Sequence, residues 1–146
     1  MRKHKEIFQI MIKKLKKIVI KATDMKILLS IKPEYAEKIF AGTKKYEFRR
    51  SIFKNPDVKT VVVYASSPVQ KVIGEFEIDS IIFTDIENLW KLTEQASDTG
   101  RSFFFQYYEG KDKGYAIKIG KTKRYETPLD LKRDFKLNPP QSFVYI

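Results

Sequence analysis

The residues best suited to chemistry lie in one short run, Gly42-Thr43-Lys44-Lys45-Tyr46-Glu47-Phe48-Arg49-Arg50. This stretch is aromatic and strand-like, and residues two apart on a strand share a face of the sheet. Glu47 and Arg49 are therefore expected side by side. Arg49 offers a planar fork of donors to a phosphate or a base edge, and Glu47 orients that fork or accepts from a base amino group.

Lys44 belongs to the same run, but strict alternation places it on the face opposite Glu47. It joins the other two charges only if the chain is still turning at Gly42-Thr43. In that case it is a phosphate-binding charge or, once desolvated, a general base. The competing interpretation of Glu47 and Arg49 is an ion pair on a solvated sheet face, which contributes about 0–1 kcal/mol.

Further candidate binding residues lie where expected strands end or begin. Lys32 follows a strand and precedes a helix N-terminus, which itself favours anions. Gln141 and Ser142 follow two rigid prolines and carry groups that read base edges, although a barrel-closing turn explains them as well. Ser66 is expected in a turn, and it stays a candidate because a lysine can activate a hydroxyl without histidine.

The composition excludes several classes of enzyme. Cysteine is absent, and the single histidine is His4, in a lysine-rich N-terminal stretch. Ser-His-Asp catalysis, Cys-His catalysis and an ordinary zinc site are therefore excluded from the folded part. We expect no cofactor, and the absence of cysteine fits a reducing, cytoplasmic location.

The charge points to a polyanionic partner. The formal net charge is +11 and the pI is about 9.7, which favours RNA, a nucleotide or DNA as ligand. Residues 1–24 carry eight basic and two acidic side chains, a net of +6, and residues 25–146 carry the remaining +5. The basic character is thus concentrated at the N-terminus.

We interpret residues 1–24 as a basic amphipathic extension and residues 25–146 as one domain. Apolar residues recur at helical spacing from Lys5 to Lys21, and lysine pairs interrupt them, which argues against a secretory signal or a membrane span. Three interpretations compete: a nucleic-acid or membrane-surface arm, a helix packed on the domain, or a mis-assigned translation start before Met25. The last two are favoured because the domain looks complete without the extension.

Proline, glycine and apolar spacing predict an α+β fold, a small mixed β-barrel of about five or six strands with peripheral helices and no βαβα repeat. The expected strands are Lys26–Ile31, Thr43–Arg50, Thr60–Ala65 at the centre, Gln70–Phe83 with a bulge or barrel bend at Gly74, Gly114–Gly120 continuing toward Tyr125, and Ser142–Ile146. The expected helices are Pro33–Ala41 ended by Gly42, Ile86–Ala96 capped by Asp85, Arg101–Tyr108, and Pro128–Phe135 as a short helix or turn.

Two aromatic features have competing interpretations. Phe103-Phe104-Phe105 with Tyr107 and Tyr108 could stack on bases. Helical spacing instead places Phe104, Tyr107 and Tyr108 on one face, so core packing is favoured and at most one of the five is expected to be exposed. Tyr64, at the end of a buried strand, is expected in the core for the same reason.

Five segments together resemble one family, the ASCH domain of the PUA-like superfamily, over Met25–Ile146. The segments are Ser30-Ile31-Lys32-Pro33, the Gly-x-Lys-x-x-Glu-x-Arg run from Gly42 to Arg49, Tyr64-Ala65-Ser66-Ser67-Pro68, Gly74-Glu75-Phe76 and Pro139-Pro140-Gln141-Ser142-Phe143. Within this family the chain resembles the small bacterial and archaeal members labelled predicted transcriptional regulators. The resemblance implies a compact barrel, a cleft lined by the residues of the Gly42–Arg49 run, and RNA binding.

The resemblance also implies two alternatives to RNA recognition. Some ASCH proteins are amidohydrolases that remove an acyl group from N4-acetylcytidine with a lysine, a threonine and a glutamate. Lys44 matches the lysine, whereas Glu47 stands where those enzymes have the threonine, so this chain lacks that hydroxyl. In an enzyme of this kind Lys44 acts as base and Glu47 orients or stabilises. DNA-linked regulation rests on the family label alone, because residues 1–24 are too short for a helix-turn-helix.

Overall fold

The computed structural model describes the backbone of residues 2–23 and 25–146, and the side chains of residues 3–14 and 25–146. Within these residues, six strands form one mixed sheet in the order β2-β5-β4-β3-β1-β6. β1 and β3 are parallel, and the other neighbours are antiparallel. The elements are α1 (Arg2–Thr23), β1 (Lys26–Ile31), α2 (Pro33–Ala41), β2 (Tyr46–Arg49), β3 (Thr60–Ala65), β4 (Lys71–Asp85), α3 (Ile86–Thr93), the 3₁₀ turn η1 (Glu94–Ala96), α4 (Arg101–Tyr107), β5 (Lys113–Leu129), α5 (Leu131–Phe135) and β6 (Phe143–Tyr145).

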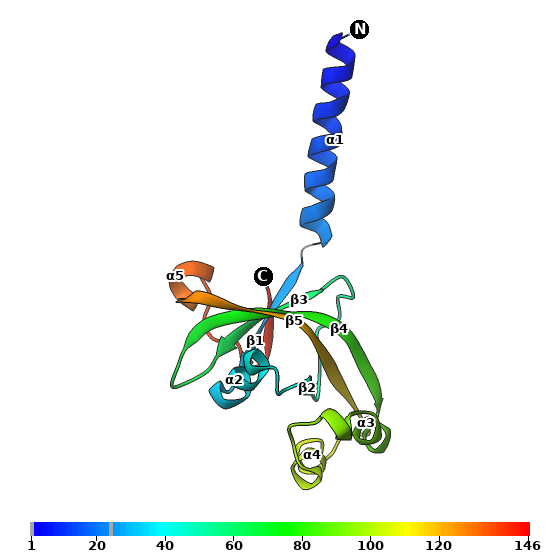
Figure 1. Cartoon of the computed structure of the whole chain (residues 1–146), viewed down its shortest axis with the longest axis vertical. Helices are drawn as coiled ribbons and strands as arrows, with labels where there is room; N and C mark the ends of the chain where they lie inside the picture. Colours follow the sequence, from blue (N-terminus) through cyan, green and yellow to red (C-terminus); the bar gives the residue numbers. More distant parts are fainter. Residues whose placement is uncertain (1, 24) are drawn as a thin grey trace.

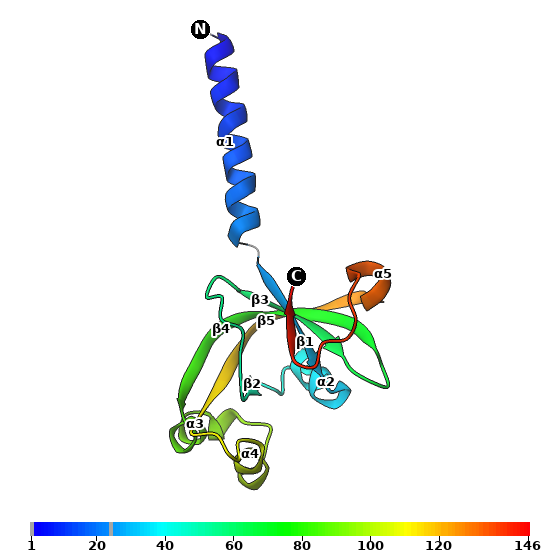
Figure 2. The ribbon, with the colours of Figure 1, turned by 180° about the vertical axis from the view of Figure 1, so that it is seen from behind.

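The sheet curves into a half-barrel with short helices around it, which confirms the predicted α+β fold (Figure 1). Strands β4 and β5 form a long bent ribbon across the molecule. Helices α3 and α4 lie at one end of this ribbon and α5 at the other, as the view from behind also shows (Figure 2). The strand order leaves two edges, β2 and β6, so the predicted barrel is only half closed.

Strand β3 is the apolar centre of the sheet, as its β-branched sequence predicts. It lies between β4 and β1 and is buried on both faces. Val61 and Val63 pack with α2 in one core cluster, whereas Val62 and Tyr64 pack with Leu131 of α5 in another. The expectation that Tyr64 belongs to the core is confirmed.

The link from α2 to β2 differs from the sequence prediction in a way that matters for the site. Helix α2 begins at Pro33 and ends at Gly42, which adopts a left-handed φ of 82°, as predicted. The predicted strand from Thr43 is wrong at its start, because the amides of Thr43 and Lys44 both donate to the carbonyl oxygen of Lys38. These donors close the helix and cannot join a strand ladder, so β2 begins at Tyr46.

The β4 bulge and the α3 cap follow the sequence prediction. The register of β4 shifts between Val72 and Gly74 against β5, and a Cβ at Gly74 would lie 2.6 Å from the carbonyl oxygen of Lys123. The carboxylate of Asp85 accepts from the amide of Asn88 and caps α3. The predicted Ile86–Ala96 helix is divided into α3 and the 3₁₀ turn η1.

Helix α4 packs on β2 through aromatic rings. The rings of Phe104 and Phe48 meet edge-on with centroids 5.1 Å apart, and Tyr108 packs against both. Of the five clustered aromatic residues, Phe103 is exposed and the other four are buried or half-buried. The preference for core packing is therefore confirmed.

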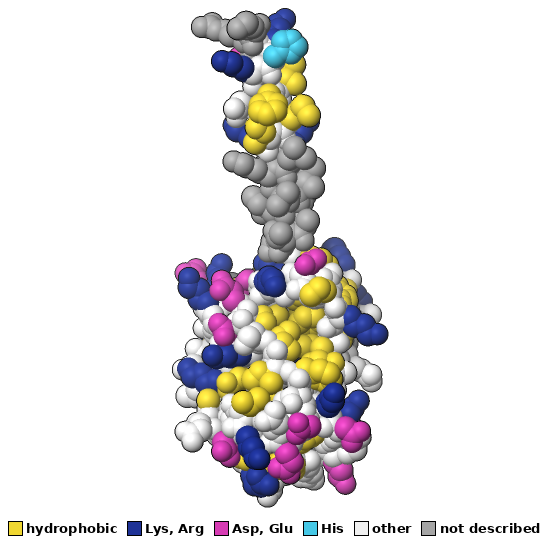
Figure 3. All heavy atoms as spheres, turned by 90° about the vertical axis from the view of Figure 1, so that its right-hand side faces the viewer, with side chains coloured by type: hydrophobic (Ala, Val, Ile, Leu, Met, Phe, Trp, Pro, Cys, Tyr) yellow, Lys and Arg dark blue, Asp and Glu magenta, His cyan; other side chains and the backbone are white. Residues whose placement is uncertain are grey.

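Helix α1 covers the predicted helical segment. Its described side chains are exposed, apart from Ile12, which is partly buried. Figure 3 shows apolar side chains and lysines side by side on this part of the helix. None of the helices that the structure describes combines the length and apolar character needed to cross a bilayer.

Candidate functional site

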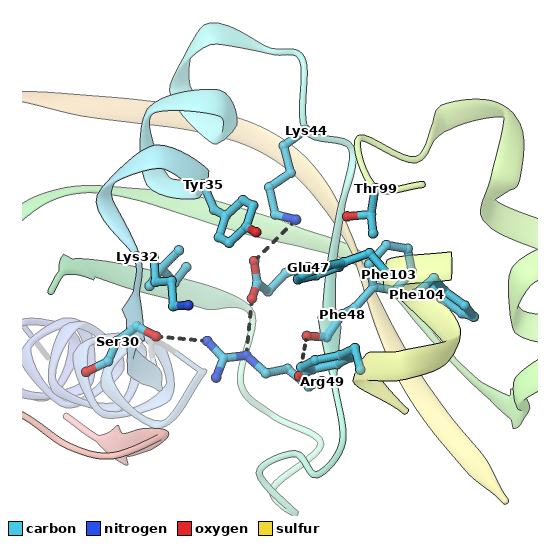
Figure 4. Close-up of a pocket in the computed structure, with 12 residues that line it drawn as sticks. Ser30, Lys32, Tyr35, Lys44, Glu47, Phe48, Arg49, Thr99, Phe103 and Phe104 are labelled. Atoms are coloured by element: carbon cyan, nitrogen blue, oxygen red, sulfur yellow. Dashed lines mark hydrogen bonds and ion pairs between the residues drawn. The ribbon is translucent and has the colours of Figure 1, made fainter. Parts of the chain in front are cut away.

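A pocket of about 240 Å³ lies where β2, at one edge of the half-barrel, faces the end of β1 (Figure 4). Helix α2 and the α4 region complete its walls. Its volume is slightly below the roughly 300–1,000 Å³ of sites for drug-sized ligands, so it suits a small group such as one base. The lining residues are Ser30, Ile31, Lys32, Tyr35, Lys44, Glu47, Phe48, Arg49, Thr99, Phe103, Phe104 and Tyr107.

Arg49 is held at the pocket floor by contacts to two strands. Strand alternation places it beside Glu47, with 3.2 Å between Arg49 Nε and Glu47 Oε1. Arg49 Nη2 also donates to the carbonyl oxygen of Ser30 at 3.0 Å. The guanidinium therefore spans the opening between β2 and β1, and the predicted juxtaposition of Glu47 and Arg49 is present.

Lys44 joins these charges because the chain is still turning after Gly42. Its Nζ lies 3.8 Å from Glu47 Oε2 and 3.4 Å from Asp98 Oδ1. The three side chains are only 6%, 10% and 7% exposed for Lys44, Glu47 and Asp98. This is a buried network rather than an ion pair on a solvated sheet face.

Three polar atoms of this network have no hydrogen-bond partner within the described part of the chain. They are Glu47 Oε2, Arg49 Nε and Asp98 Oδ2. The Arg49 Nε–H lies close to Glu47 but is not aligned with its oxygen. Because buried polar atoms are almost always hydrogen-bonded, these three leave the charge network behind the pocket incompletely satisfied.

Aromatic rings form much of the remaining wall. Phe103 is 53% exposed and presents its ring at the pocket, whereas Tyr107 is fixed by a 3.0 Å bond from its hydroxyl to the carbonyl oxygen of Phe48. Lys44 Nζ lies 5.4 Å from the centre of the Tyr35 ring. Burial, followed by the carboxylates of Glu34, Asp98 and Glu47, raises the pKa of Tyr35, so its hydroxyl stays protonated at neutral pH.

The structure brings together four of the seven predicted ligand-binding residues. Lys32, Lys44, Glu47 and Arg49 line the pocket, and Lys32 is exposed at its mouth beside the N-terminus of α2. The other three, Ser66, Gln141 and Ser142, are not among the residues that line the pocket. The amide of Ser66 donates to the carbonyl oxygen of Ile31.

The predicted segment around Gln141 and Ser142 also supports the pocket from behind. The carbonyl oxygen of Ser142 accepts from the amide of Ser30, and Ser30 Oγ donates to the carbonyl oxygen of Pro140 at 2.7 Å. Neither Gln141 nor Ser142 is among the lining residues. This placement agrees with the alternative of a closing turn that bonds to the backbone.

Sequence reasoning missed Asp98 and Tyr35. Tyr35 could have been found, since it follows Lys32 by three residues and so shares a helix face with the pocket mouth. Asp98 carries no such signal, because it lies in an irregular segment between η1 and α4. Among the side chains of residues 3–14 and 25–146, no three acidic, histidine or cysteine groups gather closely enough to hold a metal ion.

The model of the ASCH domain matches residues 29–126. The chain belongs to the ASCH domain family. The resemblance inferred from the five segments is therefore confirmed, and so is the predicted type of fold. The crystal structure of ASCH from Zymomonas mobilis superposes with a TM-score of 0.74 at 28% identity, covering 83% of this chain and 87% of that one.

Relatives of this ASCH domain include proteins of different kinds. An ASCH domain-containing ribonuclease from Zymomonas mobilis is 29% identical over 126 residues, 82% of each chain. Large ribosomal subunit protein uL22 of Ureaplasma parvum is 31% identical over 120 residues, and ATP synthase subunit alpha of that species is 32% identical over 122. The matched segments span only 39% and 15% of those two proteins, although they cover 82% of this chain.

Proposed function

We propose that this ASCH domain binds RNA and holds one nucleotide in the pocket between β1, α2, β2 and α4. The observation that carries the proposal is the buried network of Lys44, Glu47, Arg49 and Asp98 beside an open pocket, with three polar atoms unpartnered. A nucleotide suits the pocket in front of this network, since a base edge carries both donors and acceptors.

The pocket walls fit the remaining parts of a nucleotide. The exposed ring of Phe103 provides a surface on which a base can stack, a contact that contributes about 1–3 kcal/mol. Lys32 is exposed and lines the pocket, where its ammonium can pair with a phosphate. The base and the phosphate thus have separate partners in one site.

The charge and the relatives support RNA as the polymer. The net charge of +11 provides attraction to a nucleic-acid backbone that does not depend on sequence. One relative that matches over most of its length is named a ribonuclease, and another is named a protein of the large ribosomal subunit. Both names place similar segments in proteins concerned with RNA.

The test is an anisotropy titration of the full chain with labelled single-stranded RNA at several salt concentrations, with duplex DNA as competitor. Phe103→Ala removes the exposed ring, and Leu92→Ala is the matched control because Leu92 is 56% exposed on α3, outside the pocket lining. We expect Phe103→Ala to weaken binding about 5- to 100-fold and Leu92→Ala to leave it unchanged. Equal affinities for both variants would contradict the proposal.

RNA cleavage is the second candidate function, and the ribonuclease among the relatives favours it. In transesterification the ribose 2′-oxygen attacks phosphorus while the 5′-oxygen leaves, so one group takes a proton and another gives one. Carboxylates accept protons, and the ammonium of Lys44 or the hydroxyl of Tyr35 donates them. The assay is a gel of end-labelled RNA incubated with wild type and with Lys44→Met. Turnover that persists in Lys44→Met argues against this role for Lys44.

Removal of an acyl group from a modified cytidine is the third candidate. Lys44 Nζ lies 3.8 Å from Glu47 Oε2, so the two groups named for this role form an ion pair within one pocket. The assay follows release of acetate from N4-acetylcytidine by the full chain. Binding of RNA with neither cleavage nor acetate release would identify the domain as a recognition module.

A further inference from the structure

Helix α1 carries an apolar row that faces solvent. In its described part, Ile7, Phe8, Ile10 and Met11 are 55–62% exposed. The steps of three and four residues between Ile7, Phe8 and Met11 place them on one side of the helix. Isolated exposed apolar side chains are common, but four within five positions of one helix form a continuous surface.

The opposite side of the same helix is polar and basic. Lys5, Gln9 and Lys13 follow at four-residue steps on this side, whereas Lys3 and Lys14 lie in line with Ile7 along the helix. Residues 1–24 have a net charge of +6, with Glu6 as the one acid inside the described helical segment 3–14. The helix therefore joins an apolar row to a dense positive charge.

We propose that α1 binds to the surface of a bilayer that contains anionic lipids, lying in the headgroup region with its apolar row inserted. An amphipathic helix with lysines on its polar face and large apolar side chains on the other binds in this way, by apolar burial and by attraction to anionic headgroups. The proposed partner of this helix is thus the surface of an anionic lipid bilayer.

Two other partners would match only one of the two properties of this helix, its positive charge or its apolar row. An RNA backbone matches the lysines but leaves Ile7, Phe8 and Met11 in water. A second copy of α1 covers the apolar row but brings two segments of net charge +6 to within helix-packing distance, where like charges repel. An anionic bilayer takes up the apolar row and neutralises the lysines together.

The experiment is flotation of the full chain with vesicles of phosphatidylcholine alone or mixed with phosphatidylglycerol. We expect binding to the mixed vesicles and little to the neutral ones. Phe8→Gln removes the largest apolar side chain of the row and should weaken binding about tenfold or more. Leu92→Gln, on α3, is the matched control and should bind as the wild type does.

A second set of variants tests how much the lysines of α1 contribute to vesicle binding. Lys13→Gln with Lys14→Gln should weaken binding about fivefold for each lysine removed. The control is Lys121→Gln, an exposed lysine of β5. Equal binding to neutral and mixed vesicles, or no effect of Phe8→Gln, would overturn the proposal.

Two further measurements exclude the other occupants. Sedimentation of the full chain without vesicles should show no association that Phe8→Gln abolishes, because such association would identify a second copy as the occupant. The RNA affinity of Phe8→Gln should equal that of the wild type. A loss of RNA binding in this variant, without vesicle binding in the wild type, would assign the helix to RNA instead.

Discussion

Arg49 Nη2 donates to the carbonyl oxygen of Ser30 at 3.0 Å, and this bond joins the two sides of the half-barrel. Arg49 lies on β2, at one end of the strand order, and Ser30 lies on β1, next to the other end. A contact that closes the sheet and lines the pocket serves both stability and binding. Substitutions at Arg49 should therefore affect both.

Arg49→Lys should destabilise the chain by about 1–3 kcal/mol. The lysine keeps the charge but cannot reach both Ser30 and Glu47 with a planar fork, so a charged hydrogen bond across the opening is lost. Urea unfolding measures the change. Arg101→Lys is the control, since Arg101 is exposed and its guanidinium lies over the ring of Phe105. Equal stabilities of the two variants would show that the bond to Ser30 contributes nothing.

Lys44 and Asp98 should be energetically coupled although they are 54 positions apart. Lys44→Met leaves the carboxylates of Glu47 and Asp98 buried without their cation, which should cost about 3–5 kcal/mol. With Asp98→Asn already present, the same substitution should cost about 0.5–3 kcal/mol less. A double-mutant cycle by chemical denaturation measures this difference. Strictly additive effects would mean that the ion pair is absent in solution.

The elements that form the scaffold could be predicted from the sequence because their signals are local. β1, α2 and β3 have the predicted bounds, since apolar runs, Pro33 and Gly42 define them without help from distant residues. The bulge at Gly74 was predicted for the same reason.

The site could be predicted only in part because it is assembled from distant segments. Glu47 and Arg49 were predicted from strand alternation within one run. Lys44 reaches Glu47 only because of the way in which α2 ends. Asp98 pairs with Lys44 only because of where α4 packs. Gln141 does not line the pocket, and a polar segment after two prolines looks the same in the sequence whether it faces a ligand or supports a strand.

Gly74→Ala tests the close approach at the β4 bulge. A Cβ at this position would lie 2.5 Å from the ring of Phe40 and 2.6 Å from the carbonyl oxygen of Lys123. The backbone atom cannot move away easily, so we expect a loss of about 1–3 kcal/mol. The control is Gly100→Ala, where a Cβ meets nothing within 4 Å. The two melting temperatures should differ clearly, and similar values would mean that the bulge is not as tight as described.

Glu37 should give the stability a dependence on acid pH. Two hydrogen bonds from Arg124 lower the pKa of the Glu37 carboxyl below its usual 4.5. A lowered pKa in the folded state means that the stabilisation is present above pH 4.5 and is lost as pH falls through the lower value. Because both side chains are exposed, the contribution is at most about 1 kcal/mol.

The matching measurement is denaturation of wild type and Glu37→Gln from about pH 7 down to about pH 3. The wild type should be the more stable at neutral pH, and the difference should shrink as the carboxylate is protonated. A difference that stays constant across this range would assign the effect of Glu37→Gln to something other than its ionisation.

The most direct test of the central claim, that the pocket holds a nucleotide, is a titration of the isotope-labelled full chain with the four nucleoside monophosphates, followed by amide chemical shifts. We expect saturable shifts at Ser30, Lys32, Lys44, Arg49 and Phe103 with at least one nucleotide, and none at the exposed β5 segment around Lys121. Shifts confined to the basic surface away from the pocket, or no shifts with any of the four, would contradict it.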